Sequence, residues 1–169
     1  MIHLYCGMGK GKTTAACGLC VRAIGSGLRV LFVQFFKNGT SSEIKALSAL
    51  NGVETVYSSQ YYGRFKTMTE EQKAKIQVSY NDLMQDIIRR SAQYDMIILD
   101  EAVSAYMYGM IDNDAMLSFL KQEGQKREII LTGREPEPEL IALADYVTDM
   151  RKVKHPFDRG ITARKGIEF

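Results

Sequence analysis

The fold of this chain is decided by Gly7-Met8-Gly9-Lys10-Gly11-Lys12-Thr13-Thr14, which lies between a short apolar run, residues 2–6, and a helix expected over residues 12–24. Glycines at alternate positions allow positive φ, so that successive backbone N–H groups can point inward. At a helix N-terminus, where the macrodipole adds partial positive charge, such a loop forms a cradle for anions. The strand, loop and helix therefore predict a phosphate-binding loop rather than a glycine-rich turn with an exposed lysine.

Two side chains of this loop carry the chemistry of nucleotide binding. Lys12 is expected to reach the outer phosphates, which makes it a candidate catalytic residue, and the Thr13 hydroxyl is placed to ligate Mg²⁺. The usual pattern, G-x-x-x-x-G-K-[ST], has glycine where this chain has Cys6. The turn must therefore be made by Gly7 and Gly9. Every residue of the quoted stretch is a candidate for nucleotide binding.

A second stretch ends an expected buried strand with two acids. Residues 96–99 are apolar and lead directly into Asp100 and Glu101. In phosphate-loop proteins such acids hold Mg²⁺ or orient a reacting water, and oxygen ligands suit this hard cation. Both acids are candidate metal ligands, and the residues alone do not separate them. The alternative is a solvated strand end, which the presence of the phosphate loop disfavours.

Alternating strand and helix patterns predict the fold class. Strand patterns cover residues 2–6, 30–36, 53–57, 94–101, 127–132 and 146–150. Helical patterns cover residues 12–24, 43–50, 69–90, 112–125 and 136–144, and the long one opens with a capping box. This order predicts an α/β fold, a mainly parallel sheet with helices on both faces and RecA-like phosphate-loop architecture. One domain is expected over residues 1–169.

Composition excludes several classes of partner. The formal net charge of +2 is too small to indicate nucleic acid, and the basic run at residues 151–154 is interpreted as a solvated strand end, with contact to an anionic ligand as the alternative. No window approaches the roughly 18 apolar residues of a membrane span. No secretory signal is recognisable in residues 1–18. We therefore expect a cytoplasmic protein with neither nucleic acid nor membrane as partner.

The chain has three cysteines, and two of them have C-x-x-C spacing. Cys17 and Cys20 could form a redox pair or half of a zinc site. They fall inside the helix expected after the phosphate loop, and no second pair of ligands completes a tetrad. We interpret them as small buried helix residues with reduced thiols.

Residues 58–67 form the least regular part of the sequence and contain several aromatic residues. Tyr61, Tyr62 and Phe65 lie here, outside any predicted helix or strand. Aromatic residues crowded into a loop are harder to explain as core than those on a strand face. At least one of them is expected to face a ligand, and packing beneath the loop is the alternative.

Arg134 follows the strand expected over residues 127–132, at the sheet edge where the phosphate loop also lies. A guanidinium there is suited to bidentate contact with phosphate, so Arg134 is the second candidate catalytic residue. Arg22 lies near the far end of the first helix. It could reach back to a ligand, although a surface ion pair is the default interpretation.

Six pieces of the sequence carry a resemblance to one family. They are residues 7–14, 22–25, 33–37, 98–101, 131–134 and 153–160. In this order they resemble the ATP:corrinoid adenosyltransferases of the phosphate-loop class, and residues 153–160 are the most discriminating piece. The resemblance implies transfer of the 5′-deoxyadenosyl group from ATP to the cobalt of a reduced corrinoid, leaving triphosphate.

The resemblance also implies roles for individual residues. Lys12, Thr13, Arg22, Glu101 and Arg134 would hold the nucleotide and its Mg²⁺, and Lys37 belongs to a matching piece and is counted with the binding residues.

Family members usually have aromatic residues that include tryptophan against the lower face of the corrin. This chain has no tryptophan, so Tyr61, Tyr62 and Phe65 would take that place. His155 could be proposed as a cobalt ligand, but a structural hydrogen bond is the favoured interpretation.

Partners follow from the same resemblance. ATP and a reduced corrinoid are the expected substrates, a flavoprotein-type reductant is a candidate partner, and relatives suggest a homodimer. Two other functions fit a phosphate loop. One is a small nucleoside kinase, in which Asp100 and Arg134 would serve the γ-phosphate, and the other is a non-catalytic regulator that binds a nucleotide or corrinoid.

Overall fold

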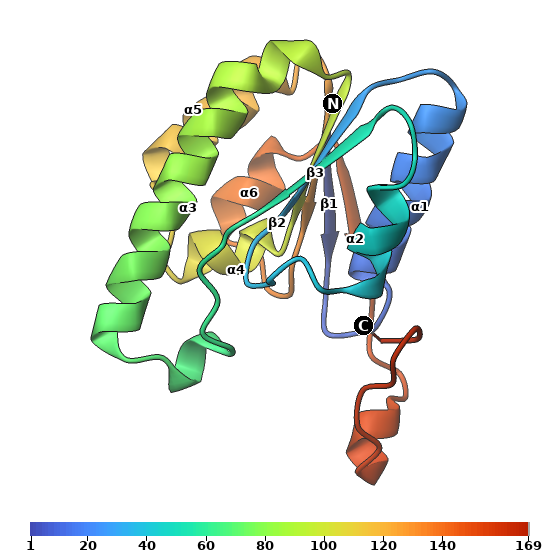
Figure 1. Cartoon of the computed structure of the whole chain (residues 1–169), viewed down its shortest axis with the longest axis vertical. Coiled ribbons are helices and arrows are strands. Elements are labelled where there is room, and N and C mark those ends of the chain that lie inside the picture. Colours follow the sequence, from blue (N-terminus) through green and yellow to red (C-terminus); the bar gives the residue numbers. More distant parts are fainter. Residues whose placement is uncertain (169) are drawn as a thin grey trace.

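The computed structural model describes residues 1–168, which form a six-stranded sheet between two layers of helices (Figure 1). The strand order is β3-β2-β4-β5-β1-β6, and every pair of neighbouring strands in the described chain is parallel. The strands are β1 (Ile2–Cys6), β2 (Val30–Gln34), β3 (Val53–Tyr57), β4 (Met96–Asp100), β5 (Glu128–Thr132) and β6 (Tyr146–Asp149). The predicted α/β fold class is confirmed.

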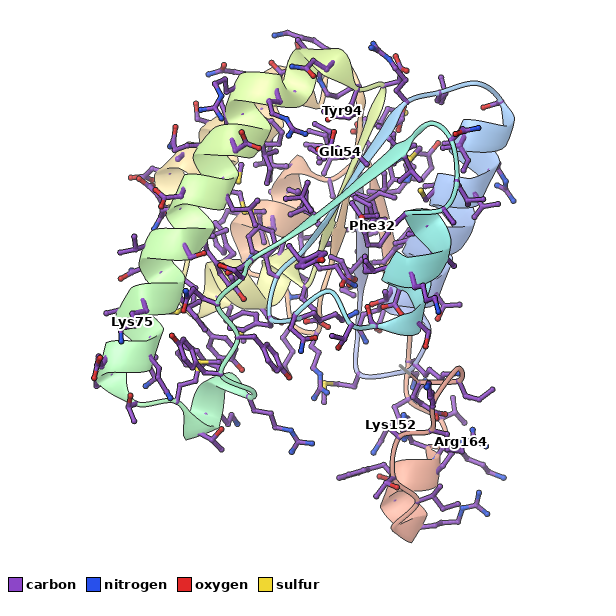
Figure 2. The ribbon with its side chains drawn as sticks, in the orientation of Figure 1. Phe32, Glu54, Lys75, Tyr94, Lys152 and Arg164 are labelled. Atoms are coloured by element: carbon purple, nitrogen blue, oxygen red, sulfur yellow. The ribbon has the colours of Figure 1, made fainter. Side chains whose placement is uncertain are left out.

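Helices cover both faces of the sheet, as expected. They are α1 (Lys12–Gly25), α2 (Ser42–Leu47), α3 (Glu70–Arg90), α4 (Ala102–Met107), α5 (Asn113–Glu123) and α6 (Pro138–Leu143), with 3-10 turns at Phe65–Thr67, Ser91–Gln93 and Pro156–Arg159. α1 and α2 pack on one face, where Phe32 is fully buried (Figure 2). The larger core lies on the other face beneath α3 to α6 and includes Leu99 and Tyr80.

Local sequence signals explain most of these boundaries. β2 and β4 are buried along their whole length, as expected for central parallel strands covered on both faces. The capping box at the start of α3 is present, because the Thr69 hydroxyl accepts from Gln72 N–H and the Gln72 amide oxygen accepts from Thr69 N–H. Helix α4 was not predicted. The strand predicted to reach residue 36 ends at Gln34, because Phe36 adopts a positive φ of 51°.

The carboxyl ends of the strands meet at one edge of the sheet, where the expected site residues lie. Strand register pairs Gln34 with Asp100 and Tyr5 with Thr132.

Residues 151–168 extend away from the body beyond this edge, with Lys152 and Arg164 on the extension (Figures 1 and 2). The basic run at residues 151–154 is exposed, as expected, but it lies just past the end of β6 rather than in the strand itself. Among residues 1–168, no helix combines the length and the apolar character that crossing a membrane requires.

Candidate active site

The phosphate loop has the curled backbone that its glycines predicted. Gly7 and Gly11 have φ values of 100° and 115°, which side chains with a Cβ rarely adopt. Gly9 is required for a different reason. A Cβ at Gly9 would lie 2.4 Å from the carbonyl oxygen of Met150, which accepts a hydrogen bond of 2.6 Å from Gly9 N–H. The loop is therefore fixed against the chain that follows β6.

Lys12 folds over this loop from the first turn of α1. Its ammonium donates to the carbonyl oxygens of Gly7 and Gly9, both at 2.7 Å. Burial lowers the pKa of Lys12 from its ordinary value. An ammonium held by main-chain carbonyls at the mouth of an anion cradle is positioned to exchange those contacts for phosphate oxygens.

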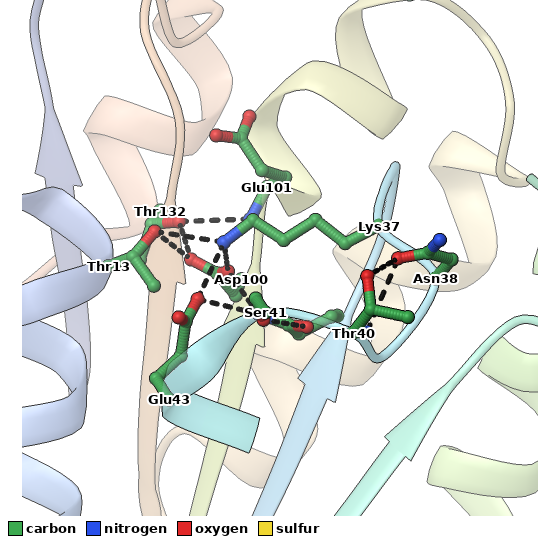
Figure 3. A network of polar contacts seen from close by, with 10 residues as sticks. Thr13, Lys37, Asn38, Thr40, Ser41, Glu43, Asp100, Glu101 and Thr132 are labelled. Atoms are coloured by element: carbon green, nitrogen blue, oxygen red, sulfur yellow. Dashed lines mark hydrogen bonds and ion pairs between the residues drawn. The ribbon is translucent and has the colours of Figure 1, made fainter. Parts of the chain in front are cut away.

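Asp100 is the centre of the polar network at the end of β4 (Figure 3). Its side chain is fully buried, and its Oδ1 accepts from the hydroxyls of Thr13 at 2.8 Å and Thr132 at 2.7 Å. Its Oδ2 accepts from the amide of Gln34 at 3.1 Å and the ammonium of Lys37 at 2.8 Å. Four donors, one of which is the cationic ammonium of Lys37, compensate the burial of this carboxylate.

Lys37 joins Asp100 to a third acid, which the sequence analysis did not single out. The Lys37 ammonium lies 3.2 Å from Glu43 Oε1 and 3.5 Å from the Thr13 hydroxyl (Figure 3). Burial works to lower the pKa of Lys37, but the carboxylates of Asp100 and Glu43 raise it above its ordinary value. The ammonium is therefore a firmly held cation between these oxygens.

These oxygens fit Mg²⁺ bound together with a nucleotide. The Lys37 ammonium already occupies a cation position between the Thr13 hydroxyl and Asp100. Nowhere in residues 1–168 do three or more His, Cys, Asp or Glu side chains converge as a protein-only metal site requires. Mg²⁺ is commonly held by one or two carboxylates, with phosphates and water completing its coordination. A hydroxyl and a buried carboxylate beside a phosphate cradle match that arrangement.

Glu101 points away from this network (Figure 3). Its backbone has a φ of 60°, its N–H donates to the Thr132 hydroxyl at 2.9 Å, and its carboxylate accepts from the Ser104 hydroxyl at 2.9 Å. Burial, followed by the nearby charge of Asp100, raises the pKa of Glu101. The two acids that the sequence could not separate thus differ in surroundings, since Asp100 contacts Thr13 and Glu101 faces the neighbouring cleft.

A cleft of about 730 Å³ opens beside the phosphate loop. It is lined by Met8, Phe36, Tyr61, Gly63, Arg64, Phe65, Lys66, Glu101, Ser104, Tyr108, Arg134, Lys152, His155, Phe157 and Asp158. One wall comes from residues 58–67, here called the aromatic loop, and another comes from the extension after β6. The aromatic loop at residues 58–67 and the family-matching piece at residues 153–160 therefore line the same cleft, although they are distant in sequence.

The aromatic loop contributes unequally to this cleft. Tyr61 and Phe65 line it, as expected for residues that face a ligand. Tyr62 is absent from the lining: its ring packs against the main core, and its hydroxyl donates to the Gln60 side chain at 2.6 Å. For Tyr62 the structure therefore shows packing beneath the loop, which was the alternative interpretation.

Two aromatic residues of the cleft were not recognised from the sequence. The rings of Phe65 and Tyr108 are stacked, with centroids 4.1 Å apart, and Phe36 meets both of them edge-on, at 6.3 and 6.1 Å. Phe36 was assigned to a strand, and Tyr108 follows the unpredicted helix α4. The signals available for Phe36 were the apolar run at the end of the second strand pattern and its place in the family-matching piece at residues 33–37.

The remaining candidates lie at different distances from the loop. Arg134 lines the cleft, and its carbonyl accepts from Gly7 N–H at 2.7 Å. Lys10 and Thr14 are exposed. Arg22 is exposed in the last turn of α1, about 15 Å along the helix axis from Lys12 at 1.5 Å per residue. The structure therefore brings Arg134, but not Arg22, to the loop.

His155 lines the cleft and has a structural role in the extension after β6. Its Nδ1 accepts from Phe157 N–H at 3.2 Å and caps the following 3-10 turn. This contact confirms the structural hydrogen bond that was favoured for His155.

The C-x-x-C pair shows no sign of redox chemistry. Cys17 and Cys20 are free thiols on α1, and burial raises their pKa values to about 12 and about 11. Such thiols stay protonated and unreactive at neutral pH. Both lie on α1 as predicted, and Cys20 is buried as expected, whereas Cys17 is only half-buried.

The fold and the loop define a nucleotide-binding α/β protein of the phosphate-loop class. Two solved structures share this fold at 13% identity. One is the flagellar accessory protein FlaH from Methanocaldococcus jannaschii, with a TM-score of 0.56 over 88% of this chain and 69% of that chain. The other is EssC (ATPases 2 and 3) from Geobacillus thermodenitrificans, with a TM-score of 0.53 over 98% of this chain and 34% of that one. At this identity the similarity shows the fold alone.

Within that class the chain belongs to the family described as ATP:corrinoid adenosyltransferase BtuR/CobO/CobP, whose model matches residues 1–169. It is 32% identical to a corrinoid adenosyltransferase of Pseudomonas aeruginosa over 100% of this chain and 83% of that protein. It is also 32% identical to the Escherichia coli K12 corrinoid adenosyltransferase, over 100% of this chain and 85% of that protein. Corrinoid adenosyltransferase CobA of Salmonella typhimurium is 31% identical, again over 100% and 85%.

Proposed function

We propose that this chain transfers the 5′-deoxyadenosyl group of ATP to the cobalt of a reduced corrinoid. The observation that carries the proposal is the shared border of the phosphate loop and the aromatic cleft. Met8 belongs to the phosphate loop and lines the cleft. Arg134 also lines the cleft, and its carbonyl accepts a hydrogen bond from the loop. A phosphate group in the cradle and a planar apolar ligand in the cleft would thus be neighbours.

The reaction is a substitution at carbon. The electron pair of cobalt(I) attacks C5′ of ATP and forms the cobalt–carbon bond. The C5′–oxygen bond breaks, its electron pair stays on the α-phosphate oxygen, and triphosphate leaves. Because cobalt(I) is a strong nucleophile, the protein has to position the reactants and stabilise the leaving group rather than supply a base.

The nucleotide side of the site stabilises the leaving triphosphate. The positive end of α1 and the Lys12 ammonium would face the anion, and Arg134 would add a guanidinium from the cleft wall. Thr13 and Asp100 would hold Mg²⁺, which neutralises charge on the triphosphate when bound. We propose that the 5′ carbon, rather than the γ-phosphate, faces the cleft.

The cleft side of the site would hold the corrinoid. Phe36, Tyr61, Phe65 and Tyr108 supply aromatic surface in a chain that has no tryptophan. Aromatic rings stack well on extended apolar faces, and here three of them already form one cluster. The backbone of Phe36 connects this cluster directly to Lys37 of the polar network.

Other features remain proposals that follow from the family and the sequence. We propose that a flavoprotein-type reductant supplies the electron that makes cobalt(I), that two copies form a homodimer in the cytoplasm, and that residues 1–169 act as one catalytic domain.

The proposed bond can be observed directly with ATP that is ¹³C-labelled at C5′. The protein is incubated with this ATP, Mg²⁺ and chemically reduced cobalamin, and carbon NMR follows the labelled carbon. We expect its resonance to move to that of a methylene bound to cobalt. If the label remains bonded to oxygen while ATP is consumed, the proposed function is wrong and a kinase activity is favoured.

A further inference from the structure

The Lys37 ammonium occupies oxygen atoms that the proposed function assigns to a metal ion. It lies 2.8 Å from Asp100 Oδ2 and 3.5 Å from the Thr13 hydroxyl, and its third acceptor is Glu43 Oε1 at 3.2 Å. A cation bound by Thr13 and Asp100 would lie within about 4 Å of this ammonium, a distance at which like charges repel strongly away from bulk water. The two cations therefore exclude each other from Asp100.

The backbone fixes the position of Lys37 on both sides. The preceding residue, Phe36, has a φ of 51°, which is uncommon for a residue with a Cβ, and its N–H donates to the hydroxyl of the fully buried Tyr80. Two residues after Lys37, Gly39 has a φ of 72°, and a Cβ there would lie 2.2 Å from the ring of Tyr57. A strained segment that is held by two tyrosines indicates that the position of Lys37 is specified by the fold.

Glu43 is the more exposed of the two acids that the Lys37 ammonium already contacts. It lies near the start of α2, its side chain is 22% exposed whereas that of Asp100 is 0% exposed, and it also accepts from the Gln34 amide at 3.3 Å. The Lys37 ammonium can therefore leave the buried carboxylate and still keep an ionic partner at the rim of the site.

We propose that Lys37 is a tethered counter-ion that neutralises Asp100 in the nucleotide-free protein and moves to Glu43 when metal and nucleotide bind. This inference rests on the proposed role of Mg²⁺ in the site. Lys37 would then act as a positioning residue with two states. In the first it prevents free divalent cations from binding to Asp100, so that metal enters only with ATP. In the second its ammonium remains beside the phosphate cradle.

The test uses Mn²⁺ alone as the probe of the nucleotide-free protein. Free Mn²⁺ is measured by electron paramagnetic resonance during titration of the wild type and of Lys37→Met. We expect Lys37→Met to bind Mn²⁺ tighter by about tenfold or more, because Asp100 loses its competing cation. Lys45→Met is the matched control, because it removes an exposed lysine from the neighbouring helix α2 and should bind Mn²⁺ as the wild type does.

A second variant tests the other position of the ammonium. Glu43→Gln should weaken binding of Mn²⁺–ATP by about fivefold, because the departing ammonium loses its ionic partner, while ATP affinity in the presence of EDTA stays unchanged. The loss should disappear in the Lys37→Met background, where no ammonium has to move.

Two results would overturn the proposal: Mn²⁺ affinity in folded Lys37→Met equal to that of the wild type, or Mn²⁺–ATP affinity unchanged by Glu43→Gln. If Lys37→Met does not fold, the Glu43→Gln measurement alone decides. These titrations contain no corrinoid, so their outcome is separate from that of the adenosyl-transfer experiment.

Discussion

The ring of Phe65 lies parallel to that of Tyr108, with centroids 4.1 Å apart and an interplanar angle of 6°. The two residues come from the aromatic loop and from the end of α4, so this stack joins two segments that line the cleft. The Lys73 ammonium lies 5.0 Å from the Phe65 ring centroid and adds a cation–π contact.

Phe65→Ala should impair the corrinoid side of the reaction and leave ATP binding nearly unchanged. The variant removes one ring of the stack and part of the apolar surface of the cleft, a loss of about 1.4 kcal/mol that corresponds to about tenfold in corrinoid affinity. Steady-state kinetics with varied reduced cobalamin gives this value, and calorimetry gives the ATP affinity. Tyr62→Phe is the control, because Tyr62 lies outside the cleft. An equal fall in affinity for both substrates would contradict the assignment of Phe65 to the corrinoid.

Lys12→Ala should abolish most ATP binding while the protein stays folded. Among the described residues the ammonium donates to loop carbonyls alone, and a charge-assisted contact to phosphate contributes about 2–3 kcal/mol, or roughly 30- to 150-fold in affinity. Calorimetric titration with Mg²⁺–ATP measures the loss. Lys10→Ala is the matched control, since Lys10 is an exposed lysine of the same loop and should cost far less. If Lys12→Ala binds ATP as the wild type does, the stretch is not a phosphate loop.

Asp100→Asn should destabilise the fold and remove the effect of Mg²⁺ on ATP affinity. The neutral side chain leaves the Lys37 ammonium without its buried partner, and its amide group meets hydroxyl and amide donors. Loss of a buried charged partner costs about 3 kcal/mol. Urea unfolding measures the first effect, and ATP titrations with and without Mg²⁺ measure the second. Retention of the full Mg²⁺ effect in Asp100→Asn would show that the metal is held elsewhere, with Glu101 as the next candidate.

Glu101→Gln should be more stable than the wild type at neutral pH. The native pKa of Glu101 is raised above the ordinary value of 4.5, so the native state holds this proton more tightly than the unfolded state does. The stabilisation is complete below pH 4.5 and is lost as the pH rises through the native pKa. Glutamine stays neutral and escapes this loss. Urea unfolding of both proteins between acidic and neutral pH should show curves that diverge as the pH rises, and parallel curves would contradict the prediction.

The sequence predicted the sheet, the phosphate loop, the two acids that follow the buried strand at residues 96–99, and most helix boundaries. Each of these features rests on a local pattern. It could not separate Asp100 from Glu101, because the difference depends on the backbone of Glu101 leaving the strand with a positive φ. Nor did periodicity reveal that the second strand stops before Phe36. The positive φ at Phe36 is supported by a hydrogen bond to Tyr80, which is distant in sequence.

The polar network around Asp100 is a further feature that sequence could not supply. Lys37 and Glu43 were visible as charged residues in or near a predicted loop, but the contact of Lys37 with Asp100 requires β2 and β4 to be neighbours in register. Strand order is a property of the whole chain. The same reason explains why Tyr108 was missed as the stacking partner of Phe65.

The central claim is that the chain transfers the adenosyl group at C5′ and releases the three phosphates together. Phosphorus NMR of a reaction with ATP, Mg²⁺ and chemically reduced cobalamin tests it most directly, with the cobalt–carbon product counted by its absorbance in the same sample. We expect intact triphosphate in a one-to-one ratio with adenosylated product. Release of ADP with a phosphorylated acceptor, or tight ATP binding without turnover, would contradict it.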